Sequence, residues 1–314
     1  AHDPDTFSRW EAAQTLAQNC ILSQVEARAA GREMELEPAL VAAFARLLDD
    51  KDADPALRAE AMMLPGEEYL AAQMKVVDVD GIHAARDFIR KGLAGALSER
   101  LRGTYESLNG ARPYSKSPSA MARRSLKNLC LAYLVEEDGG DGLAVSQLQR
   151  SDNMTDTLAA LAGLVLSDSA AAPEALSDFE RTWKANALVM DKWFAIQAMK
   201  PGPDTAHDVR RLLEHPAFSI RNPNKVRSLI GVFCMMNHTG FHCADGSGYA
   251  LLAEQVIRLN AINPQIAARM ASAFNRWRRY DASRQSLMKA ALKRIASEPG
   301  LSPDVGEIVS NALD

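Results

Sequence analysis

The chain has 314 residues, which exceeds the size at which a single hydrophobic core usually stops growing, so two domains or an elongated stack of small units is expected. Apolar residues make up 47% and aromatic residues only 6%, while Ala and Leu recur throughout, which favours helices over strands. The net charge of −4 argues against a general nucleic-acid binder, and no apolar run has the length of a membrane span.

Helical periodicity can be followed almost from end to end in the first half of the chain. Residues 7–30 place apolar side chains at the three–four spacing of one buried face, and Gly31 ends this helix. Proline stands early in two of the helices that follow, where its missing N–H costs nothing. The predicted helices of this half span residues 7–30, 38–48, 55–63, 80–108 and 117–136.

The second half has a tighter rhythm. Three of its helices begin with a capping residue followed by proline, at Asn222, Asn263 and Ser302. The predicted helices span residues 143–151, 154–166, 173–185, 189–199, 205–215, 223–236, 249–260, 264–280, 282–297 and 303–313. A pair of helices with its turns recurs every ~40 residues, near the length of helical-repeat families.

This rhythm predicts an all-α fold, an irregular α-solenoid of HEAT- or armadillo-like helix pairs with a concave face. We expect one domain over residues 1–314, in which residues 1–150 form an N-terminal half and residues 151–314 a half with tighter helix pairing. No consensus recurs from pair to pair, so the array is expected to be irregular.

Positive charge is concentrated near the C-terminal end. Residues 210–294 contain 14 Lys or Arg and 4 Asp or Glu, an excess of +10, so the remainder carries −14. Such asymmetry is compatible with an RNA-binding face, an anionic partner, the lining of a cavity or a plain basic helix surface.

The four cysteines indicate a reducing, cytoplasmic setting. They form no CxxC pair, and Cys20 and Cys130 lie in apolar helical stretches typical of small buried residues. No secretory signal precedes the first helix. The first residue is Ala1 rather than Met, so we expect a fragment or a processed product.

One cluster contains residue types that bind zinc: Cys234, His238, His242 and Cys243. We favour a structural interpretation, because Gly240 is expected to break the register that would align the two imidazoles. The loop over residues 245–249 is interpreted as a flexible lead into a helix, since it lacks the Gly-Lys-Ser/Thr end of a phosphate-binding loop.

Several basic residues have both a functional and a structural interpretation. Gln265 and Arg269 are four residues apart on one side of a helix, and Arg227 holds a similar position after Asn222. On the residues alone these are surface side chains. Residues 276–280 mix basic and aromatic residues as single-strand nucleic-acid binders do, but cations at a helix C-terminus also complement the helix dipole.

Two hydrolase motifs are missing from the sequence. No histidine is followed by glutamate, so there is no His-Glu-x-x-His zinc helix, and no Gly-x-Ser-x-Gly elbow occurs. We therefore expect this chain alone to be catalytically inactive and to bind no metal or other cofactor.

Long segments of the chain resemble the C-terminal helical domain of bacterial aminopeptidase N. The segments are Ala187-Leu-Val-Met-Asp-Lys-Trp-Phe194, Asn222-Pro-Asn-Lys-Val-Arg-Ser-Leu-Ile-Gly231 and Asp245-Gly-Ser-Gly-Tyr249. Shorter matches, including His2-Asp-Pro and Asn153-Met-Thr-Asp156, fall in the same order, so the resemblance covers essentially the whole chain.

The resemblance implies a non-catalytic domain of a zinc aminopeptidase that removes N-terminal residues, preferring Ala and basic ones, from small peptides. The catalytic zinc and its ligands would lie in a catalytic domain upstream of this chain. The helical domain would close over that domain, shape an internal chamber and limit access to it. By the resemblance, Arg227 and Arg269 line the chamber and Gln265 borders the pocket for the first side chain.

The expected partners are the catalytic and N-terminal domains of the same polypeptide and small peptide substrates, with no nucleic acid and no membrane. We expect a monomer. The alternative is a stand-alone helical-repeat scaffold that binds a protein partner through its concave face.

Overall fold

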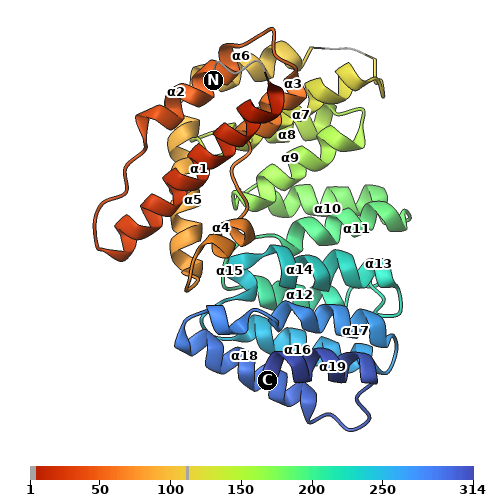
Figure 1. Ribbon diagram of the computed structural model, residues 1–314. Coiled ribbons are helices and arrows are strands. Elements are labelled where there is room, and N and C mark those ends of the chain that lie inside the picture. The colour runs from red at the N-terminus through yellow and green to blue at the C-terminus, as the bar shows by residue number, and fades with distance from the viewer. Residues whose placement is uncertain (1–4, 111–112) are drawn as a thin grey trace. The chain divides into compact units, whose positions relative to one another are not determined.

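The computed structural model describes residues 5–110 and 113–314, and the regular elements among them are all helices, which confirms the all-α class (Figure 1). The His2-Asp-Pro segment lies outside the described residues. The chain forms two compact units. Unit 1 contains the residues up to Leu70 together with Asp80–Ala175, and unit 2 contains Ala71–Val79 together with Leu176–Asp314.

Unit 1 is built from helices packed around an aliphatic core. Leu40, Phe44 and Ile89 are almost completely buried, and the Tyr133 hydroxyl donates to the Met62 carbonyl at 2.8 Å, which fastens one helix to another. The helices are α1 Thr6–Ala29, α2 Pro38–Asp49, α3 Pro55–Met62, α5 Val79–Ala96, α6 Ser98–Leu108, α7 Pro118–Leu134, α8 Asp141–Arg150 and α9 Met154–Leu166. The boundaries between the units fall within α4 Glu67–Gln73, after the first residue of α5, and within α10 Ala172–Trp183.

Unit 2 has an aromatic core. Phe233, Phe241, Tyr249 and Phe274 are fully buried and contact one another in edge-on and tilted pairs, and the equally buried Phe194 packs edge-on against Phe218. Its elements are α11 Ala187–Ala198, α12 Thr205–Leu213, α13 Pro223–Val226, the π-helix η1 Arg227–Gly231, α14 Val232–Met236, α15 His238–Phe241, α16 Ser247–Asn260, α17 Pro264–Ala271, the 3₁₀ turns η2 Ser272–Phe274 and η3 Trp277–Arg279, α18 Ala282–Ala296 and α19 Pro303–Leu313.

Two long predicted helices are interrupted. The helix predicted over residues 80–108 is divided into α5 and α6 at Leu97, whose φ of −118° and ψ of 14° leave the helical region. Leu97 is buried, so we attribute the break to packing in the core. No Gly-Pro pair in the sequence indicates it. The helix predicted over residues 264–280 ends at Ala271 and continues as two 3₁₀ turns. The short helix α4 was not predicted.

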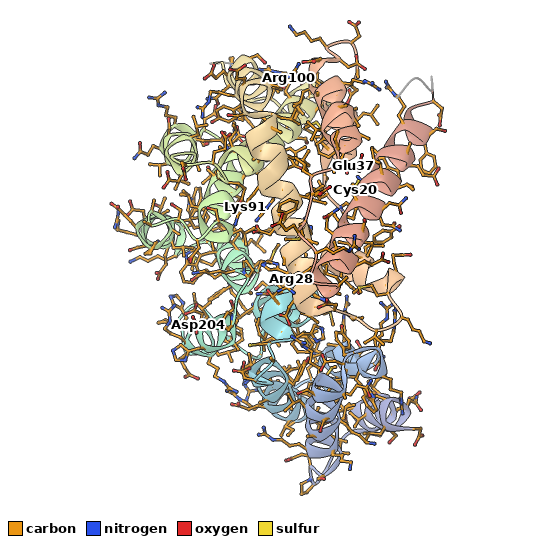
Figure 2. The ribbon with its side chains drawn as sticks, turned by 90° about the vertical axis from the view of Figure 1, so that its left-hand side faces the viewer. Cys20, Arg28, Glu37, Lys91, Arg100 and Asp204 are labelled. Atoms are coloured by element: carbon orange, nitrogen blue, oxygen red, sulfur yellow. The ribbon has the colours of Figure 1, made fainter. Side chains whose placement is uncertain are left out.

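The two cysteines expected to be buried are buried. Cys130 is fully enclosed, and burial raises the pKa of its thiol to about 12. Burial also raises the pKa of the Cys20 thiol, and the carboxylate of Glu37, which Figure 2 shows beside it, acts in the same direction. All four cysteines are free thiols.

Candidate functional site

Arg227 is positioned by a firmly anchored helix start. Asn222 caps α13, accepting a hydrogen bond from the backbone N–H of Asn224 at 2.9 Å. The buried Lys225 then donates to the Ala187 carbonyl at 2.8 Å and pairs with Asp191 at 2.8 Å. Lys225 thus attaches α13 to α11. The side chain of Arg227, two residues later, is exposed and extends from this anchored backbone. Sequence reasoning missed Lys225, since nothing local distinguishes a buried lysine from an exposed one.

Arg227 also begins a π-helical turn within what was predicted as one continuous helix over residues 223–236. The π-helix spans Arg227–Gly231, and the N–H of Val232 donates to the Arg227 carbonyl. Such turns are rare and occur frequently at functional sites. A Cβ atom placed on Gly231, the last residue of the turn, would lie 3.7 Å from the side-chain methyl group of Met270 on α17. The turn therefore packs directly against α17.

Gln265 and Arg269 lie on α17 as predicted. Asn263 caps this helix by accepting the N–H of Ile266 at 3.2 Å, which starts it at Pro264. Gln265 and Arg269 are both exposed, while Met270, the next residue along the helix, is buried. Since Met270 meets Gly231, the helix that carries Gln265 and Arg269 is in direct contact with the turn that begins at Arg227 (Figure 1).

Several other basic residues of the 210–294 segment have structural partners. Arg210 pairs with Glu254 at 2.6 Å, and Arg284 pairs with Asp281 at 2.9 Å. In contrast, within residues 5–110 and 113–314 the Arg269 side chain makes no hydrogen bond or ion pair, so its guanidinium is available to a ligand. Arg227 makes one long contact of 3.5 Å, to the Asn224 side chain.

The basic and aromatic run over residues 276–280 holds the fold together. Trp277 is buried and donates through Nε1 to the Ala312 carbonyl at 2.7 Å, and Arg278 donates to the same carbonyl at 2.9 Å. Arg279 donates to the carbonyls of Ala71, Ala72 and Met74. These residues therefore donate to carbonyls near the ends of α19 and α4, in line with the structural interpretation. They form a 3₁₀ turn, however, and not the end of a long helix.

The expectation that Gly240 would separate the two histidines was wrong. Residues His238–Phe241 form the short helix α15, and the imidazoles of His238 and His242 lie with ring centroids 5.1 Å apart. Both ring nitrogens of His242 are nevertheless engaged, Nδ1 with the Tyr249 hydroxyl and Nε2 with the Tyr280 hydroxyl, each at 2.9 Å. This engagement leaves His242 no free lone pair for a metal.

The loop over residues 245–249 is tightly packed. Gly246 has a φ of 73°, which favours glycine, and the Asp245 carboxylate accepts the Ser247 N–H at 2.8 Å. A side chain at Gly248 would overlap the Phe241 carbonyl, so this glycine allows α16 to begin directly against α15.

The part of the chain that the structure describes has no group of three or more His, Cys, Asp or Glu side chains able to hold a metal ion. In the same part of the chain, no helix combines the length and the apolar character needed to cross a membrane.

A family model described as a domain of unknown function (DUF3458_C) with ARM repeats matches residues 1–314. The chain belongs to this family. The ARM-repeat description confirms the prediction of an armadillo-like, solenoid-type arrangement of helices.

Similarity to whole proteins points in the same direction. The chain is 38% identical over 307 residues to aminopeptidase N of Haemophilus influenzae, a match that covers 98% of this chain and 35% of the relative. It is 37% identical over 314 residues to aminopeptidase N of Escherichia coli, covering 99% and 36%. The resemblance to the C-terminal part of bacterial aminopeptidase N is thereby confirmed.

A solved structure has the same fold. The crystal structure of Legionella pneumophila aminopeptidase A in complex with aspartic acid matches with a TM-score of 0.89 and 31% identity, covering 99% of this chain and 37% of that one. This ARM-repeat chain thus spans about a third of the length of the aminopeptidases it resembles. It corresponds to the C-terminal part of these relatives.

Proposed function

We propose that this chain is the non-catalytic C-terminal domain of a zinc aminopeptidase that removes N-terminal residues, Ala and basic ones preferentially, from small peptides. The observation that carries the proposal is the match over 98–99% of this chain to only 35–36% of two aminopeptidases N. Its partners are the catalytic and N-terminal domains of the same polypeptide, in a monomeric enzyme. The four free thiols are in keeping with a reducing compartment such as the cytoplasm.

The proposed role of the domain is to shape the chamber in which peptides are held and to limit access to it. While the catalytic domain holds the amino end of a peptide, the free carboxylate end needs a cationic partner. A guanidinium can pair with a carboxylate through two parallel hydrogen bonds. Exposed guanidinium groups at Arg227 and Arg269, on contacting elements of unit 2, support this role. We propose that Gln265 borders the pocket for the first side chain, as the family resemblance implies.

The catalytic zinc is assigned to the missing catalytic domain. The described residues of this chain contain no metal-holding group. The sequence also has no His-Glu-x-x-His motif. Hydrolysis therefore requires the rest of the polypeptide, and the chain contributes binding and positioning only.

Substitution of Arg227 and Arg269 by Ala in the full-length enzyme tests the proposal. A charge-assisted hydrogen bond contributes ~1.5–3 kcal/mol, and a hydrated chamber favours the low end, so KM for tripeptides should rise roughly tenfold. The value of kcat should change little, because uniform binding affects KM alone. An aminoacyl-anilide has no carboxylate and should be nearly unaffected.

The matched control is Arg211→Ala, which removes an exposed arginine of unit 2 that pairs with Asp208 at 3.1 Å. It should leave both substrates unchanged. Equal tripeptide KM values for the parent, Arg227→Ala and Arg269→Ala would remove these residues from the site. Absence of any peptidase domain in the same polypeptide would instead support the stand-alone scaffold.

A further inference from the structure

A short segment of unit 2 lies, in the sequence, between two parts of unit 1. Residues Ala71–Val79 belong to unit 2 by their contacts, although the residues before Ala71 and those from Asp80 to Ala175 belong to unit 1. The chain therefore passes between the two units three times, after Leu70, after Val79 and after Ala175. We call the segment Ala71–Val79 the strap.

Two valines of the strap are buried and a third is exposed. Val77 and Val79 are almost completely buried, whereas Val76 is exposed to solvent. The backbone N–H of Val77 donates to the Arg279 carbonyl at 2.8 Å. Because Arg279 belongs to the C-terminal part of unit 2, this hydrogen bond attaches the strap to the unit with which it is grouped.

The side chain of Arg279 holds the other end of the strap, where α4 ends. Its Nη2 donates to the carbonyls of Ala71 at 3.2 Å, Ala72 at 3.1 Å and Met74. Ala71 and Ala72 lie in the last turn of α4, where helical carbonyls lack their usual N–H partners and a cation complements the helix dipole. One guanidinium thus binds a helix end that is 208 residues away in the sequence.

The turn that carries Arg279 is itself held within unit 2. Gln285 of α18 donates through Nε2 to the carbonyls of Arg278 at 3.0 Å and Tyr280 at 2.8 Å. Trp277, at the start of the turn, is buried. Since neighbouring residues hold this backbone in place, detachment of the strap breaks the hydrogen bonds from Arg279.

Attachment of the strap closes a loop in the chain of unit 1. If unit 1 unfolded while unit 2 stayed folded, the segment Asp80–Ala175 would be held by unit 2 at both ends, through the strap and through Leu176. A closed loop has less conformational entropy than a free tail, so closure disfavours the unfolded state. Unit 1 can unfold as a free tail only after the strap detaches.

We propose that the strap makes the two units stabilise each other, and that Arg279 is the residue that attaches it to unit 2. The hydrogen bonds from Arg279 are lost when unit 2 unfolds, and also when unit 1 unfolds as a free tail. Weakening them therefore lowers the stability of unit 1, although Arg279 belongs to unit 2. This coupling is independent of the proposed function.

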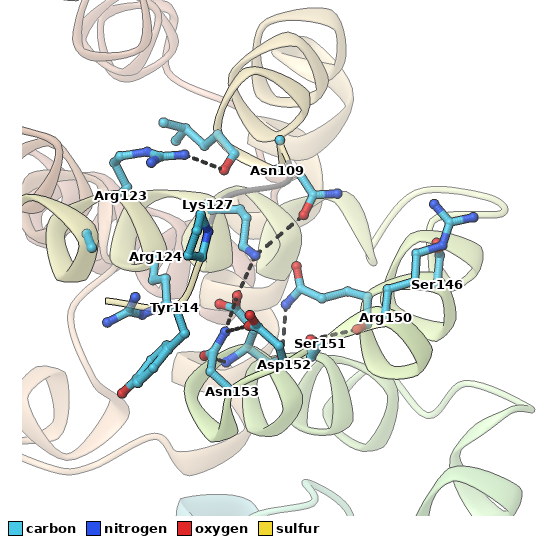
Figure 3. A pocket seen from close by; sticks show the side chains of 16 residues that line it. Asn109, Tyr114, Arg123, Arg124, Lys127, Ser146, Arg150, Ser151, Asp152 and Asn153 are labelled. Carbon is cyan, nitrogen blue, oxygen red and sulfur yellow. Dashed lines mark hydrogen bonds and ion pairs between the residues drawn. The ribbon is translucent and has the colours of Figure 1, made fainter. Parts of the chain in front are cut away.

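Hydrogen exchange of the 314-residue chain, followed by mass spectrometry, tests the proposal. Unit 1 is monitored at the amides of α7 and α9, which are joined by Lys127 and Asp156 at 2.6 Å (Figure 3). Loss of hydrogen bonds from a charged group shifts an equilibrium by a factor of ten or more, so Arg279→Ala should speed exchange of these amides at least about tenfold. Equal exchange of α7 and α9 in the parent and in Arg279→Ala would overturn the proposal.

The matched control is Arg278→Ala. Arg278 lies in the same 3₁₀ turn and also donates to carbonyls at a helix end, those of Ala312 at 2.9 Å and Leu313 at 3.0 Å. The helix that it contacts, α19, lies wholly within unit 2. This variant should therefore leave exchange in α7 and α9 unchanged. Faster exchange by the same factor in both variants would show that the coupling does not depend on the strap.

The strap offers a second pair of variants, which decides the question if Arg279→Ala fails to fold. Val77→Ala removes part of a buried side chain and should speed exchange in α7 and α9 roughly tenfold, whereas Val76→Ala, at the exposed neighbour, should not. Circular dichroism checks that each variant is folded. Faster exchange confined to residues 71–79 in the variants at Val77 and Arg279 would show that the strap is only a local part of unit 2, contrary to the proposal.

Discussion

The Nζ atom of Lys127 lies 2.6 Å from the Oδ2 atom of Asp156, and the two side chains are only 9% and 7% exposed. A charge buried to this extent needs its partner, because desolvation of a single ion costs several kcal/mol. The pair joins α7 to the first turn of α9. Packing of these two helices thus depends on both charges being present.

The first prediction concerns this pair. Lys127→Met leaves Asp156 buried without its counter-charge and should lower the free energy of unfolding by about 3–5 kcal/mol, measured by urea titration. Arg181→Ala is the control, since Arg181 and Asp178 are also 2.6 Å apart but 69% and 53% exposed. Its effect should stay below about 1 kcal/mol. Similar losses in both variants would contradict the argument.

The second prediction concerns pH. Burial, together with the nearby His238 and Arg284, holds the pKa of His242 well below its usual value of 6.5. Below its usual pKa, the His242 imidazole therefore binds a proton more readily in the unfolded chain than in the folded one. Above pH 6.5 His242 does not make the free energy of unfolding depend on pH. Below pH 6.5 that free energy should fall by up to about 1.4 kcal/mol per pH unit.

Urea titrations of the parent and of His242→Gln between pH 7.5 and 5 measure this contribution. The parent should lose stability more steeply than the variant in that interval. Asp156 does not interfere, because its pKa is lowered in the folded state and its contribution is lost only at more acidic pH. Parallel profiles for parent and variant would show that His242 is not kept neutral by the fold.

The third prediction compares two glycines inside helices. Gly248→Ala forces a methyl group into the Phe241 carbonyl and should destabilise the protein by about 1–3 kcal/mol. Gly103→Ala, in α6, meets nothing within 4 Å and should stabilise by about 0.5–1 kcal/mol, since Ala is the better helix former. Thermal melts of both variants measure the effects, and a shift of the same sign in both would refute the steric argument.

The fourth prediction concerns metal. No described group of His, Cys, Asp or Glu side chains can hold an ion, so the chain should contain no stoichiometric zinc after dialysis. EDTA should leave its melting temperature unchanged. Hydrolysis of an alanyl-anilide should not exceed that of a boiled control. One tightly bound zinc per chain, or measurable turnover, would be the contrary result.

Local capping signals fixed the helix starts that the sequence predicts best. The starts of α9, α18 and α19 were predicted at the observed residues, because the side chains of Asn153, Asp281 and Ser302 each accept a backbone N–H of the first turn. Such signals act within a few residues and are legible in the sequence. The internal breaks could not be read from the sequence, since Leu97 is a buried residue whose backbone leaves the helical region without a local Pro to indicate it.

The candidate sites divide in the same way. The positions of Gln265 and Arg269 on one helix follow from their spacing, whereas their contact with the turn at Arg227 depends on Gly231 meeting Met270, thirty-nine residues further on.

The π-helical turn has a consequence for insertions and deletions. A π-helical turn contains about one residue more than an α-helical one, and each residue of an α-helix advances the chain by about 100° around the axis. Deletion of one residue between Arg227 and Gly231 would allow an unbroken α-helix from Pro223 to Met236. Because the π-helical turn already accommodates the additional residue, its loss would leave the downstream side chains in nearly the same orientation, so Lys225 would keep its anchor and Phe233 its place in the aromatic core. Loss of one residue should therefore be better tolerated in this turn than in a neighbouring α-helical segment, where it would rotate every downstream side chain by about 100°.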